Sequence, residues 1–489
     1  MYERQYKSKG FKKVTLKELE EQIRITNNKT SIDSFGLSNV IIKKIPKEVK
    51  EFLVDLINEC LEKGELPQLW KNSIIKMIPK KSDEKNNPNS YRPISITPCI
   101  MRLVERVILK RLKEHLKDNN ILVKQQSGFR EKMSTRDNLF FLVQKSFEGF
   151  NKNKNHISIF FDITAAFDKV WHSGLIHKLV EIKTPLYLVN IIVAFLTNRK
   201  FQIKVGDFVT GLNNITCGVP QGACLSPTLF SVFINDVPRR NLKGENTLVF
   251  ADDLCYLLAY KKRTNTIEIK IKKYLVELEG WSEKWRLSMA PHKCNYMLYS
   301  IKYKLDDEID FELKLNGQLL EEVEEAKFLG LRLDPRMTFN HQVEYIRKTC
   351  SERMNILKIV SNKNWHLDVK TKTQIYKSLV RSLIEYSAPF YDTLSPKLKN
   401  ILNATQYNAL RIIHEKDKSF GNKNLLQLAQ IESIDERMKY LKNNYIKTAL
   451  ANKNPLITEI VDDYKKFKYH GRTNTNLKKM TPMCTVTLS

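Results

Sequence analysis

Two adjacent aspartates stand between two apolar runs, in the segment Phe250-Ala251-Asp252-Asp253. Leu248-Val249 precedes the acids and Leu254-Cys255-Tyr256-Leu257-Leu258 follows them, which predicts a strand, a tight turn and a second strand. A turn can aim both carboxylates near one point, and close carboxylates repel each other unless a cation lies between them. Asp oxygens suit Mg²⁺. Asp-Asp is also common in ordinary turns, so these four residues alone favour an ordinary turn.

Charge gives the first indication of a partner. The 489 residues include 82 Lys+Arg and 54 Asp+Glu, a formal net charge of +28. This excess predicts a polyanionic partner, most simply nucleic acid, although a Lys- and Asn-rich composition can also reflect base-composition bias. Charge does not separate RNA, DNA and anionic membrane. The 42% hydrophobic content argues against general disorder, and the length predicts two or three domains.

Targeting and cysteine patterns exclude several classes. The chain starts with polar residues and has no apolar signal core, and its longest mainly apolar run, Pro185 to Leu196, is too short to cross a bilayer. We therefore expect an intracellular, soluble protein with no membrane partner. The eight cysteines include no Cys-x-x-Cys pair, which argues against a zinc knuckle or a redox pair.

A third acid stands at the end of another predicted strand. His156 to Phe161 is apolar enough for a strand, Asp162 follows it, and the chain then turns into a helix. If one sheet places this strand beside the Asp252-Asp253 hairpin, the three acids gather around two metals, which lie roughly 3.5–4 Å apart in two-metal sites. Such an arrangement serves nucleotidyl transfer.

A Gly/Pro-rich turn, Gly218-Val219-Pro220-Gln221-Gly222, precedes a predicted helix over Thr228 to Val237. Its glycines, which lack side chains, leave room for a bulky group to approach. Alternatively, they are ordinary turn residues at the start of the helix. We also expect a strand over Lys327 to Leu333. Further helices are predicted from apolar spacing at 13–25, 48–60, 100–116, 186–196, 267–285, 341–360, 369–386, 397–414 and 432–450.

These motifs, in this order, resemble the reverse transcriptase of non-LTR (LINE-type) retrotransposons, most closely the Jockey-type group. The resemblance covers about Trp70 to Asp334. Its motifs are Ser90-Tyr91-Arg92-Pro93-Ile94-Ser95, Gly128-Phe129-Arg130, Phe161-Asp162, Asp168-Lys169-Val170-Trp171-His172, Gly218-Val219-Pro220-Gln221-Gly222, Phe233-Ile234-Asn235-Asp236, Phe250-Ala251-Asp252-Asp253, Lys293 and Lys327-Phe328-Leu329-Gly330.

The resemblance implies an α+β fold, a right-hand polymerase with fingers, a palm sheet bearing the Asp-Asp hairpin, and a mainly helical thumb and C-terminal region. We expect a helical N-terminal extension over 1–70 and fingers and palm over 71–335. The thumb and C-terminal helices would occupy 336–462, and 463–489 would form a basic, flexible tail.

The implied activity is RNA-directed DNA polymerisation, in which deoxynucleoside triphosphates are added to the 3′-hydroxyl of a DNA primer on an RNA template. Two Mg²⁺ ions are implied, with Mn²⁺ as the alternative ion. Asp162 and Asp252 would be the principal metal ligands and Asp253 would complete the acidic cluster. Lys293 matches a palm-loop lysine that could protonate the leaving pyrophosphate.

The resemblance also assigns substrate contacts. Phe167, five residues after Asp162, matches a steric gate that clashes with a ribose 2′-hydroxyl, although a core aromatic remains a credible alternative. Gln221 would lie beside the templating pair. Arg92 is a candidate triphosphate contact, and Lys76 is a weaker one that could simply face solvent. Asp168 is expected to cap or pair rather than bind metal.

The chain departs from the family pattern in three places. The loop Lys80-Lys81-Ser82-Asp83 lacks a usual Gly-Lys pair, Ala223 replaces a usual Ser, and Phe233 replaces a usual Tyr. No endonuclease segment and no ribonuclease H acid set is recognisable, so we expect a truncated element or an isolated polymerase segment. The alternatives are a catalytically decayed remnant or an RNA-binding scaffold with a polymerase fold. Nuclear location is expected from the element type, and the oligomeric state is not indicated.

Overall fold

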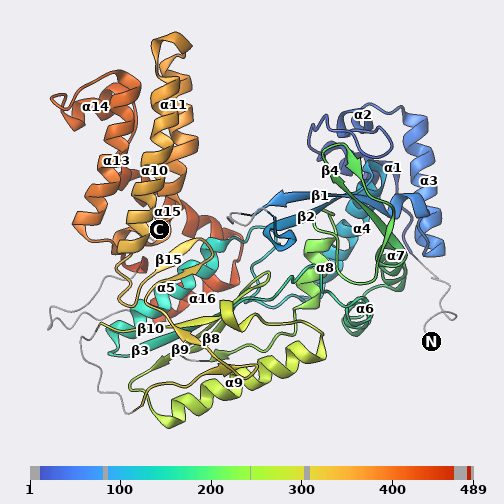
Figure 1. The fold of residues 1–489 in the computed structure, drawn as a ribbon, viewed down its shortest axis with the longest axis horizontal. Coiled ribbons are helices and arrows are strands. Elements are labelled where there is room, and N and C mark those ends of the chain that lie inside the picture. Colours follow the sequence, from blue (N-terminus) through green and yellow to red (C-terminus); the bar gives the residue numbers. More distant parts are fainter. Residues whose placement is uncertain (1–10, 81–85, 243, 302–308, 467–481, 486–489) are drawn as a thin grey trace. The chain divides into compact units, whose positions relative to one another are not determined.

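A computed structural model describes residues 11–80, 86–242, 244–301, 309–466 and 482–485. Helices and strands alternate irregularly along the chain, which gives the predicted α+β fold (Figure 1). The chain forms two units, each assembled from three separate segments. The first unit consists of Met1–Phe129, Ile163–Val237 and Gly280–Ser288, and the second of Arg130–Asp162, Pro238–Glu279 and Met289–Ser489.

The first unit contains a five-stranded sheet. Its strand order is β2-β1-β4-β5, with β6 also paired to β4. β1 pairs antiparallel with β2 and parallel with β4, so it occupies the interior of the sheet. The strands are β1 (Asn72–Pro79), β2 (Tyr91–Ile96), β4 (Arg199–Val205), β5 (Phe208–Val209) and β6 (Asn213–Ile215).

Helices of the first unit begin and end at residues suited to those positions. Thr15 caps α1 by accepting a hydrogen bond from the Glu18 N–H, and α3 ends at Gly64, whose φ of 67° is left-handed. Pro227 lies in the first turn of α8. The helices are α1 (Leu16–Arg24), α2 (Asn39–Lys43), α3 (Lys47–Lys63), α4 (Cys99–Asp118), α6 (His172–Glu181), α7 (Leu186–Leu196) and α8 (Ser226–Phe233).

The second unit is built around a six-stranded sheet with the order β13-β10-β3-β9-β8-β7. All seven residues of β3 are buried, as expected for a strand with neighbours on both edges and protein on both faces. The strands are β3 (Asn155–Phe161), β7 (Asn241–Leu242), β8 (Glu245–Phe250), β9 (Asp253–Tyr260), β10 (Asn295–Tyr299) and β13 (Glu321–Glu322).

The segment predicted as one strand over Lys327 to Leu333 is instead a hairpin. β14 (Ala326–Phe328) pairs antiparallel with β15 (Leu331–Leu333). Leu329 and Gly330 form the turn, with φ values of 46° and 83°. Two successive positive φ values suit the tight turns that match strand twist, so the prediction of a continuous strand was wrong because it ignored this turn. A further small hairpin pairs β11 (Lys314–Leu315) with β12 (Gln318–Leu319).

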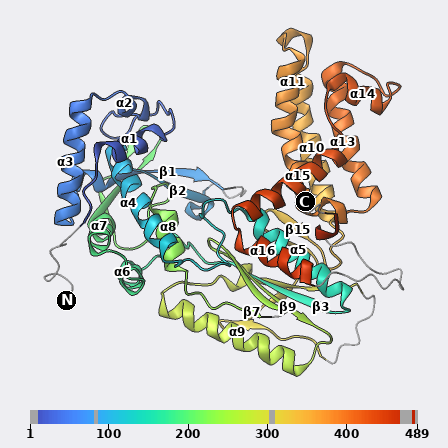
Figure 2. The ribbon, with the colours of Figure 1, turned by 180° about the vertical axis from the view of Figure 1, so that it is seen from behind.

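Helix α5 (Thr135–Asn151) contacts both the sheet and the C-terminal helices of the second unit. Ser134 and Asp137 form a reciprocal capping box at its start. The helix packs against β3 and β8 and also against α16 (Figure 2). The remaining helices of this region are α9 (Asn265–Lys284), which continues into the first unit, α10 (Asn340–Val360), α11 (Val369–Tyr376), α12 (Ser382–Glu385), α13 (Pro396–His414), α14 (Asn422–Ala429), α15 (Ile434–Ala451) and α16 (Pro455–Lys466).

A π turn, Lys377–Arg381, separates α11 from α12 within the segment predicted as one helix. A π turn carries one more residue than an α turn and leaves backbone carbonyls without their usual partners. Here Arg353 donates to the Leu379 carbonyl at 2.7 Å, and the Cys350 thiol lies 3.7 Å from the Val380 carbonyl. The buried Arg381 guanidinium pairs with Glu385 and Glu432.

The expected flexible tail, 463–489, lies largely outside the described residues. Its first residues continue α16, which ends at Lys466. Near its end Pro482–Thr485 forms a 3₁₀ turn, and Met483 is buried in the helical core. The Met483 N–H donates to the buried Gln144 side chain at 3.2 Å.

Candidate active site

The Asp252-Asp253 turn is a two-residue hairpin loop. Phe250 and Asp253 are paired residues of β8 and β9, which leaves Ala251 and Asp252 as the loop itself. Ala251 is buried and has a φ of 55°. A non-glycine residue with positive φ is uncommon and costs on the order of 1 kcal/mol or more, so the surrounding structure must hold it. The predicted strand, turn and strand are thus confirmed.

Asp162 is at the same end of the sheet as this turn. β3 pairs antiparallel with β9, and Phe161 lies opposite Leu254, so the next residue on each strand is Asp162 on one side and Asp253 on the other. The Asp162 backbone is held by the segment that precedes β10. Its carbonyl accepts a hydrogen bond from the Ala290 N–H at 2.9 Å, and its N–H points at the Cys294 sulfur at 3.4 Å.

Electrostatics show that the three acids interact. The pKa of Asp253 is raised to about 6, first by burial of the carboxyl among protein atoms and then by the negative charges of Asp252 and Asp162. Mutual repulsion of this kind is relieved by a cation. Three carboxylates are hard oxygen donors, so this set fits a divalent ion such as Mg²⁺. Among the residues that the structure describes, no three or more His, Cys, Asp or Glu side chains are placed to hold a metal ion, so a bound ion would have to draw these carboxylates closer together.

Lys293 lies beside the acids, in the 3₁₀ turn Pro291–Lys293 that precedes β10. Its ammonium is 3.6 Å from Asp162 Oδ2, and both side chains are partly exposed. Exposed pairs of this type contribute on the order of 0–1 kcal/mol to stability. The contact is better understood as a cation available to the acidic cluster than as a support of the fold.

Phe167, Gln221, Arg92 and Lys76 all belong to the first unit, whereas the acids and Lys293 belong to the second. Phe167 is half-buried and lies in the turn after Asp162. Its ring stacks on Phe230 of α8, with centroids 4.6 Å apart and planes 17° apart, and meets Phe129 edge-on at 5.9 Å. The stack fixes the ring orientation, which suits a steric gate and a packed aromatic equally.

Both glycines of the Gly218–Gly222 turn are required by close backbone approaches. Gly218 has a φ of 84°, and a Cβ there would lie 2.6 Å from the Asp168 carbonyl oxygen. Gly222 has a φ of 109°, and its Cβ would lie 2.9 Å from the Ser95 carbonyl oxygen. The bulky group that these glycines admit is therefore the protein's own backbone.

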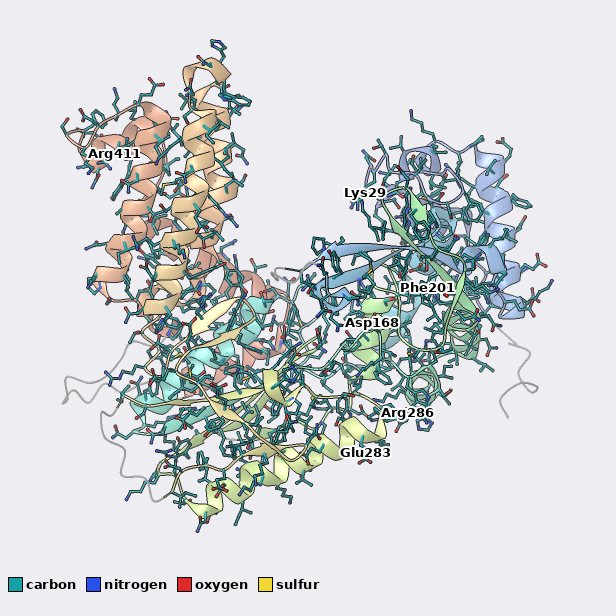
Figure 3. All side chains as sticks on the ribbon, viewed as in Figure 1. Lys29, Asp168, Phe201, Glu283, Arg286 and Arg411 are labelled. Carbon is teal, nitrogen blue, oxygen red and sulfur yellow. The ribbon has the colours of Figure 1, made fainter. Side chains whose placement is uncertain are left out.

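Gln221 is fixed by both its backbone and its side chain. Its carbonyl accepts a hydrogen bond from the Ser95 N–H of β2 at 2.7 Å. Its amide nitrogen donates to both Asp168 carboxylate oxygens, at 2.9 and 3.0 Å. Asp168, labelled in Figure 3, thus makes a pairing interaction of the kind predicted for it. Burial raises the pKa of the Asp168 carboxyl, and the Gln221 hydrogen bonds oppose that rise.

Arg92 and Lys76 share one exposed face of the first unit's sheet. Arg92 on β2 lies opposite Ile78, and Lys76 on β1 lies opposite Ile94. Residues two apart on a strand face the same side, so the two basic side chains project from the same face. Of the basic loop Lys80-Lys81-Ser82-Asp83, residues 81–83 lie outside the described residues.

Glu105 is a site residue that sequence reasoning missed. Its carboxylate is fully buried in α4, and Oε2 accepts hydrogen bonds from the Cys224 N–H at 2.5 Å and the Leu225 N–H at 3.2 Å. These N–H groups lie between the turn that carries Gln221 and the first residue of α8, Ser226, so Glu105 holds the chain where the turn meets the helix. The only signal in the sequence was an acid inside the largely apolar segment Leu103-Val104-Glu105-Arg106-Val107-Ile108.

Comparison with known families decides the assignment. The profile of the family described as reverse transcriptase (RNA-dependent DNA polymerase) matches residues 78–333, more than half of the chain. The chain belongs to this family. The matched residues include every acid of the cluster, as well as Phe167, Gln221, Arg92 and Lys293. Reverse transcriptases generally use divalent metals, in keeping with the donor set described above.

The relatives agree with the resemblance to Jockey-type elements. The chain is 28% identical over 457 residues to the RNA-directed DNA polymerase from mobile element jockey of Drosophila melanogaster, covering 91% of this chain and 49% of that protein. It is 27% identical over 441 residues to the probable RNA-directed DNA polymerase from transposon BS of the same species, covering 89% and 48%. This reverse transcriptase therefore spans about half the length of the curated relatives it matches.

Among solved structures, apo telomerase from Candida tropicalis matches with a TM-score of 0.42 and 12% identity, covering 87% of this chain and 72% of that one. Separately, no helix among the described residues has the length and apolar character needed to traverse a lipid bilayer.

Proposed function

We propose that this reverse transcriptase is an RNA-directed DNA polymerase that adds deoxynucleotides to the 3′-hydroxyl of a DNA primer on an RNA template. The meeting of Asp162, Asp252 and Asp253 at one end of the six-stranded sheet supports this proposal most directly. The three acids come from positions 90 residues apart in the chain, and the pKa of Asp253 responds to the other two charges. A structural role would not require three carboxylates that destabilise one another.

Asp162 and Asp252 would be the principal metal ligands, and Asp253 would complete the cluster nearer the primer end. Two Mg²⁺ ions, with Mn²⁺ as the alternative, would when bound lower the pKa of the primer 3′-hydroxyl and stabilise the leaving pyrophosphate. Lys293 would hold a proton close to Asp162 for the departing pyrophosphate. Its 3.6 Å distance from that carboxylate supports this role.

The remaining assignments concern the incoming nucleotide. Phe167 would exclude a ribose 2′-hydroxyl by contact with its ring, which the stack on Phe230 holds in place. Gln221 would lie beside the templating pair, with its amide oriented by Asp168. Arg92 and Lys76 would bind triphosphate oxygens, which suits two basic side chains on one exposed sheet face.

We retain the division into an extension (1–70), fingers and palm (71–335), thumb and C-terminal helices (336–462) and tail (463–489) as part of the proposal. Action in the nucleus is proposed from the type of element that the relatives represent.

Primer extension tests the proposal. Purified protein is supplied with an annealed DNA primer and RNA template, deoxynucleotides and Mg²⁺, and compared with Asp252→Asn and Asp162→Asn. We expect wild type to extend the primer and each variant to lose roughly 10²–10³-fold or more of that rate, the scale of removing one preorganised electrostatic contact. Asp310→Asn is the matched control, because this carboxylate of the same unit is 94% exposed and pairs with Arg263.

The outcomes separate enzyme from scaffold. Extension by wild type and by Asp310→Asn, with loss in the other two variants, supports the polymerase. Template binding without extension in any of the four proteins supports an RNA-binding scaffold and overturns the proposal.

A further inference from the structure

The tip of a helical hairpin in the second unit exposes an unusual set of side chains. Helix α10 ends at Val360, and α11 begins at Val369. Figures 1 and 2 label the two helices, and the connection between them includes the 3₁₀ turn Lys363–Trp365. We call residues 358–370 the hairpin tip. Trp365 is 59% exposed, and Ile359 and Val369 are also exposed.

Lower in the same hairpin, several apolar side chains are buried, although Ile356 and Tyr345 of α10 are exposed at 48% and 37%. Leu357 of α10 and Tyr376 of α11 are buried in the helical core, as are Ile346 and Cys350. Single exposed apolar residues need no explanation, but here an exposed tryptophan in the connection is accompanied by an exposed aliphatic residue near the adjoining end of each helix. Tryptophan has the largest apolar surface of any side chain, so leaving it in water calls for an occupant.

Charge identifies the kind of occupant. Between residues 353 and 377 the chain has six Lys or Arg and one acid. The acid, Asp368, is occupied as the N-cap of α11, where it accepts a hydrogen bond from the Thr371 N–H at 2.6 Å. Lys372 is buried, but Lys358 and Lys370 are exposed within the tip. The basic residues are Arg353, Lys358, Lys363, Lys370, Lys372 and Lys377.

The neighbouring helical end provides a contrast. Arg411, near the end of α13 and labelled in Figure 3, is held by the Asp417 carbonyl and the Asn422 side chain. Its guanidinium closes the connection to α14. That connection also has an aromatic ring with a cation, Phe420 beside Lys416, but Phe420 is half-buried whereas Trp365 in the hairpin tip is exposed.

We propose that the hairpin tip binds single-stranded nucleic acid, with Trp365 stacking on an unpaired base and Lys358 and Lys370 contacting the flanking phosphates. An aromatic platform flanked by cations is the usual physical basis for holding single strands without sequence preference. Paired bases offer no free face to the indole, so the tip should prefer a single strand to a duplex.

The tip is separate from the acidic cluster. Helix α10 has 21 residues and is therefore about 30 Å long, and the tip is at its far end from β15, where the helix begins. The bound nucleotides would not be those undergoing reaction. This inference does not depend on catalysis, and it holds or fails independently of the polymerase proposal.

Binding by the full chain tests the platform. Fluorescence anisotropy is measured with a labelled 20-nucleotide uridine strand, its deoxythymidine counterpart and a blunt duplex, in a background of Asp252→Asn so that no extension occurs. Trp365→Ala should weaken single-strand binding roughly 5- to 150-fold, the range for loss of one stacked base, and leave duplex binding within about twofold. Tyr440→Ala is the matched control, since Tyr440 is 60% exposed on α15 of the same unit.

A double charge-reversal variant tests the proposed phosphate contacts. Lys358→Glu with Lys370→Glu should make the salt dependence of single-strand binding shallower by about 1.4 in the log–log slope, because each lost phosphate contact removes roughly 0.7. Lys439→Glu with Lys447→Glu, on exposed positions of α15, should leave that slope unchanged.

Equal effects on RNA and DNA strands identify a platform for either chemistry, and an effect on one alone assigns the tip to that strand. Unchanged single-strand binding in Trp365→Ala overturns the proposal. So does equal weakening for the duplex, or a change of oligomeric state in Trp365→Ala by light scattering, which would assign the patch to a second copy of the chain.

Discussion

The amide nitrogen of Gln221 donates hydrogen bonds to both carboxylate oxygens of Asp168, at 2.9 and 3.0 Å. Asp168 directly follows Phe167, so this pair joins the turn that bears the proposed sugar gate to the turn that bears the proposed template contact. The carboxylate accepts only, which fixes the amide with its nitrogen toward Asp168 and its oxygen away from it.

Removing Asp168 should therefore change nucleotide selection. In Asp168→Ala we expect the KM for deoxynucleotides to rise roughly 2- to 10-fold, the equivalent of losing one ordinary hydrogen bond, with a smaller change in kcat. Asp168→Asn keeps an acceptor oxygen and should restore most of the loss. Steady-state kinetics on an RNA template measure both. A fall in kcat alone, at unchanged KM, would assign Asp168 a different role.

Asp253 predicts an unusual dependence of stability on pH. Its folded pKa of about 6 lies above the ordinary value of 3.8. A carboxyl with a raised pKa binds more protons in the folded state, so its contribution is favourable below about pH 4 and becomes unfavourable as pH rises through 6. In EDTA, Asp253→Asn should raise the melting temperature at pH 8 and have little effect at pH 4. Thermal unfolding measures this, and destabilisation by the variant at pH 8 would refute it.

At pH 8, Mg²⁺ should reverse the order of the two melting temperatures, so that wild type becomes more stable than Asp253→Asn. Wild type gains stability from the ion at pH 8, because all three carboxylates are ionised and can share it. Asp253→Asn should gain less, in the same thermal scans.

Phe167 should determine sugar selectivity through its ring. Phe167→Val is expected to raise ribonucleotide incorporation relative to deoxynucleotide incorporation, measured by single-nucleotide extension. The same change removes the stack on Phe230 and should cost about 1–3 kcal/mol of stability. Phe230→Leu breaks the stack but keeps the ring at 167, so it should lose stability with much less change in sugar choice. Equal sugar selectivity in Phe167→Val and wild type would leave Phe167 as a packing residue.

Replacing a glycine by alanine should change the free energy of unfolding in opposite directions at Gly218 and Gly280. At Gly218 the positive φ and the 2.6 Å approach to the Asp168 carbonyl make Gly218→Ala destabilising by about 2 kcal/mol or more. At Gly280, inside α9, a Cβ meets nothing within 4 Å, so Gly280→Ala should stabilise by roughly 0.5–1 kcal/mol. Urea unfolding measures both free energies, and matching signs would contradict the geometry described for the turn.

His156 should make the second unit sensitive to acid. It is fully buried in β3, its ring nitrogens have no hydrogen-bond partner among the described residues, and burial lowers its pKa to about 3. The unfolded chain binds the proton near pH 6.5, so the contribution of His156 is complete above that pH and is lost as pH falls towards 3. In His156→Leu, the free energy of unfolding should depend less on pH: between pH 4 and 6 its slope should fall by up to about 1.4 kcal/mol per pH unit. His341→Leu, an exposed control, should not.

Many helices and strands of the fold could be predicted from local sequence patterns. The Asp252-Asp253 hairpin, the strand β3 directly followed by Asp162 and helix α7 were predictable because apolar periodicity and turn chemistry act over a few residues. The short hairpin β14–β15 was missed because two successive left-handed residues, Leu329 and Gly330, interrupt what otherwise resembles one strand. The π turn was missed because its cause lies in the distant side chains of Cys350 and Arg353.

The candidate site also contains some residues that local sequence patterns predict and others that they do not. The three acids were found because each directly follows or precedes an apolar run. The partners of Gln221 were not, because Asp168 lies 53 residues away and Ser95 lies on another strand. Glu105 carried no local sign of its role, since only the folded chain shows which N–H groups its carboxylate receives.

The π turn at Lys377–Arg381 absorbs one extra residue, so the helical pieces on either side of it keep their faces. Deleting one residue between Lys377 and Val380 would merge the two pieces into a regular helix and leave Arg381 and Glu385 four residues apart and still paired. The deletion would instead remove the widened turn whose Leu379 and Val380 carbonyls face Arg353 and Cys350 of α10. The extra residue therefore couples two neighbouring helices through backbone groups that a regular helix would keep for itself.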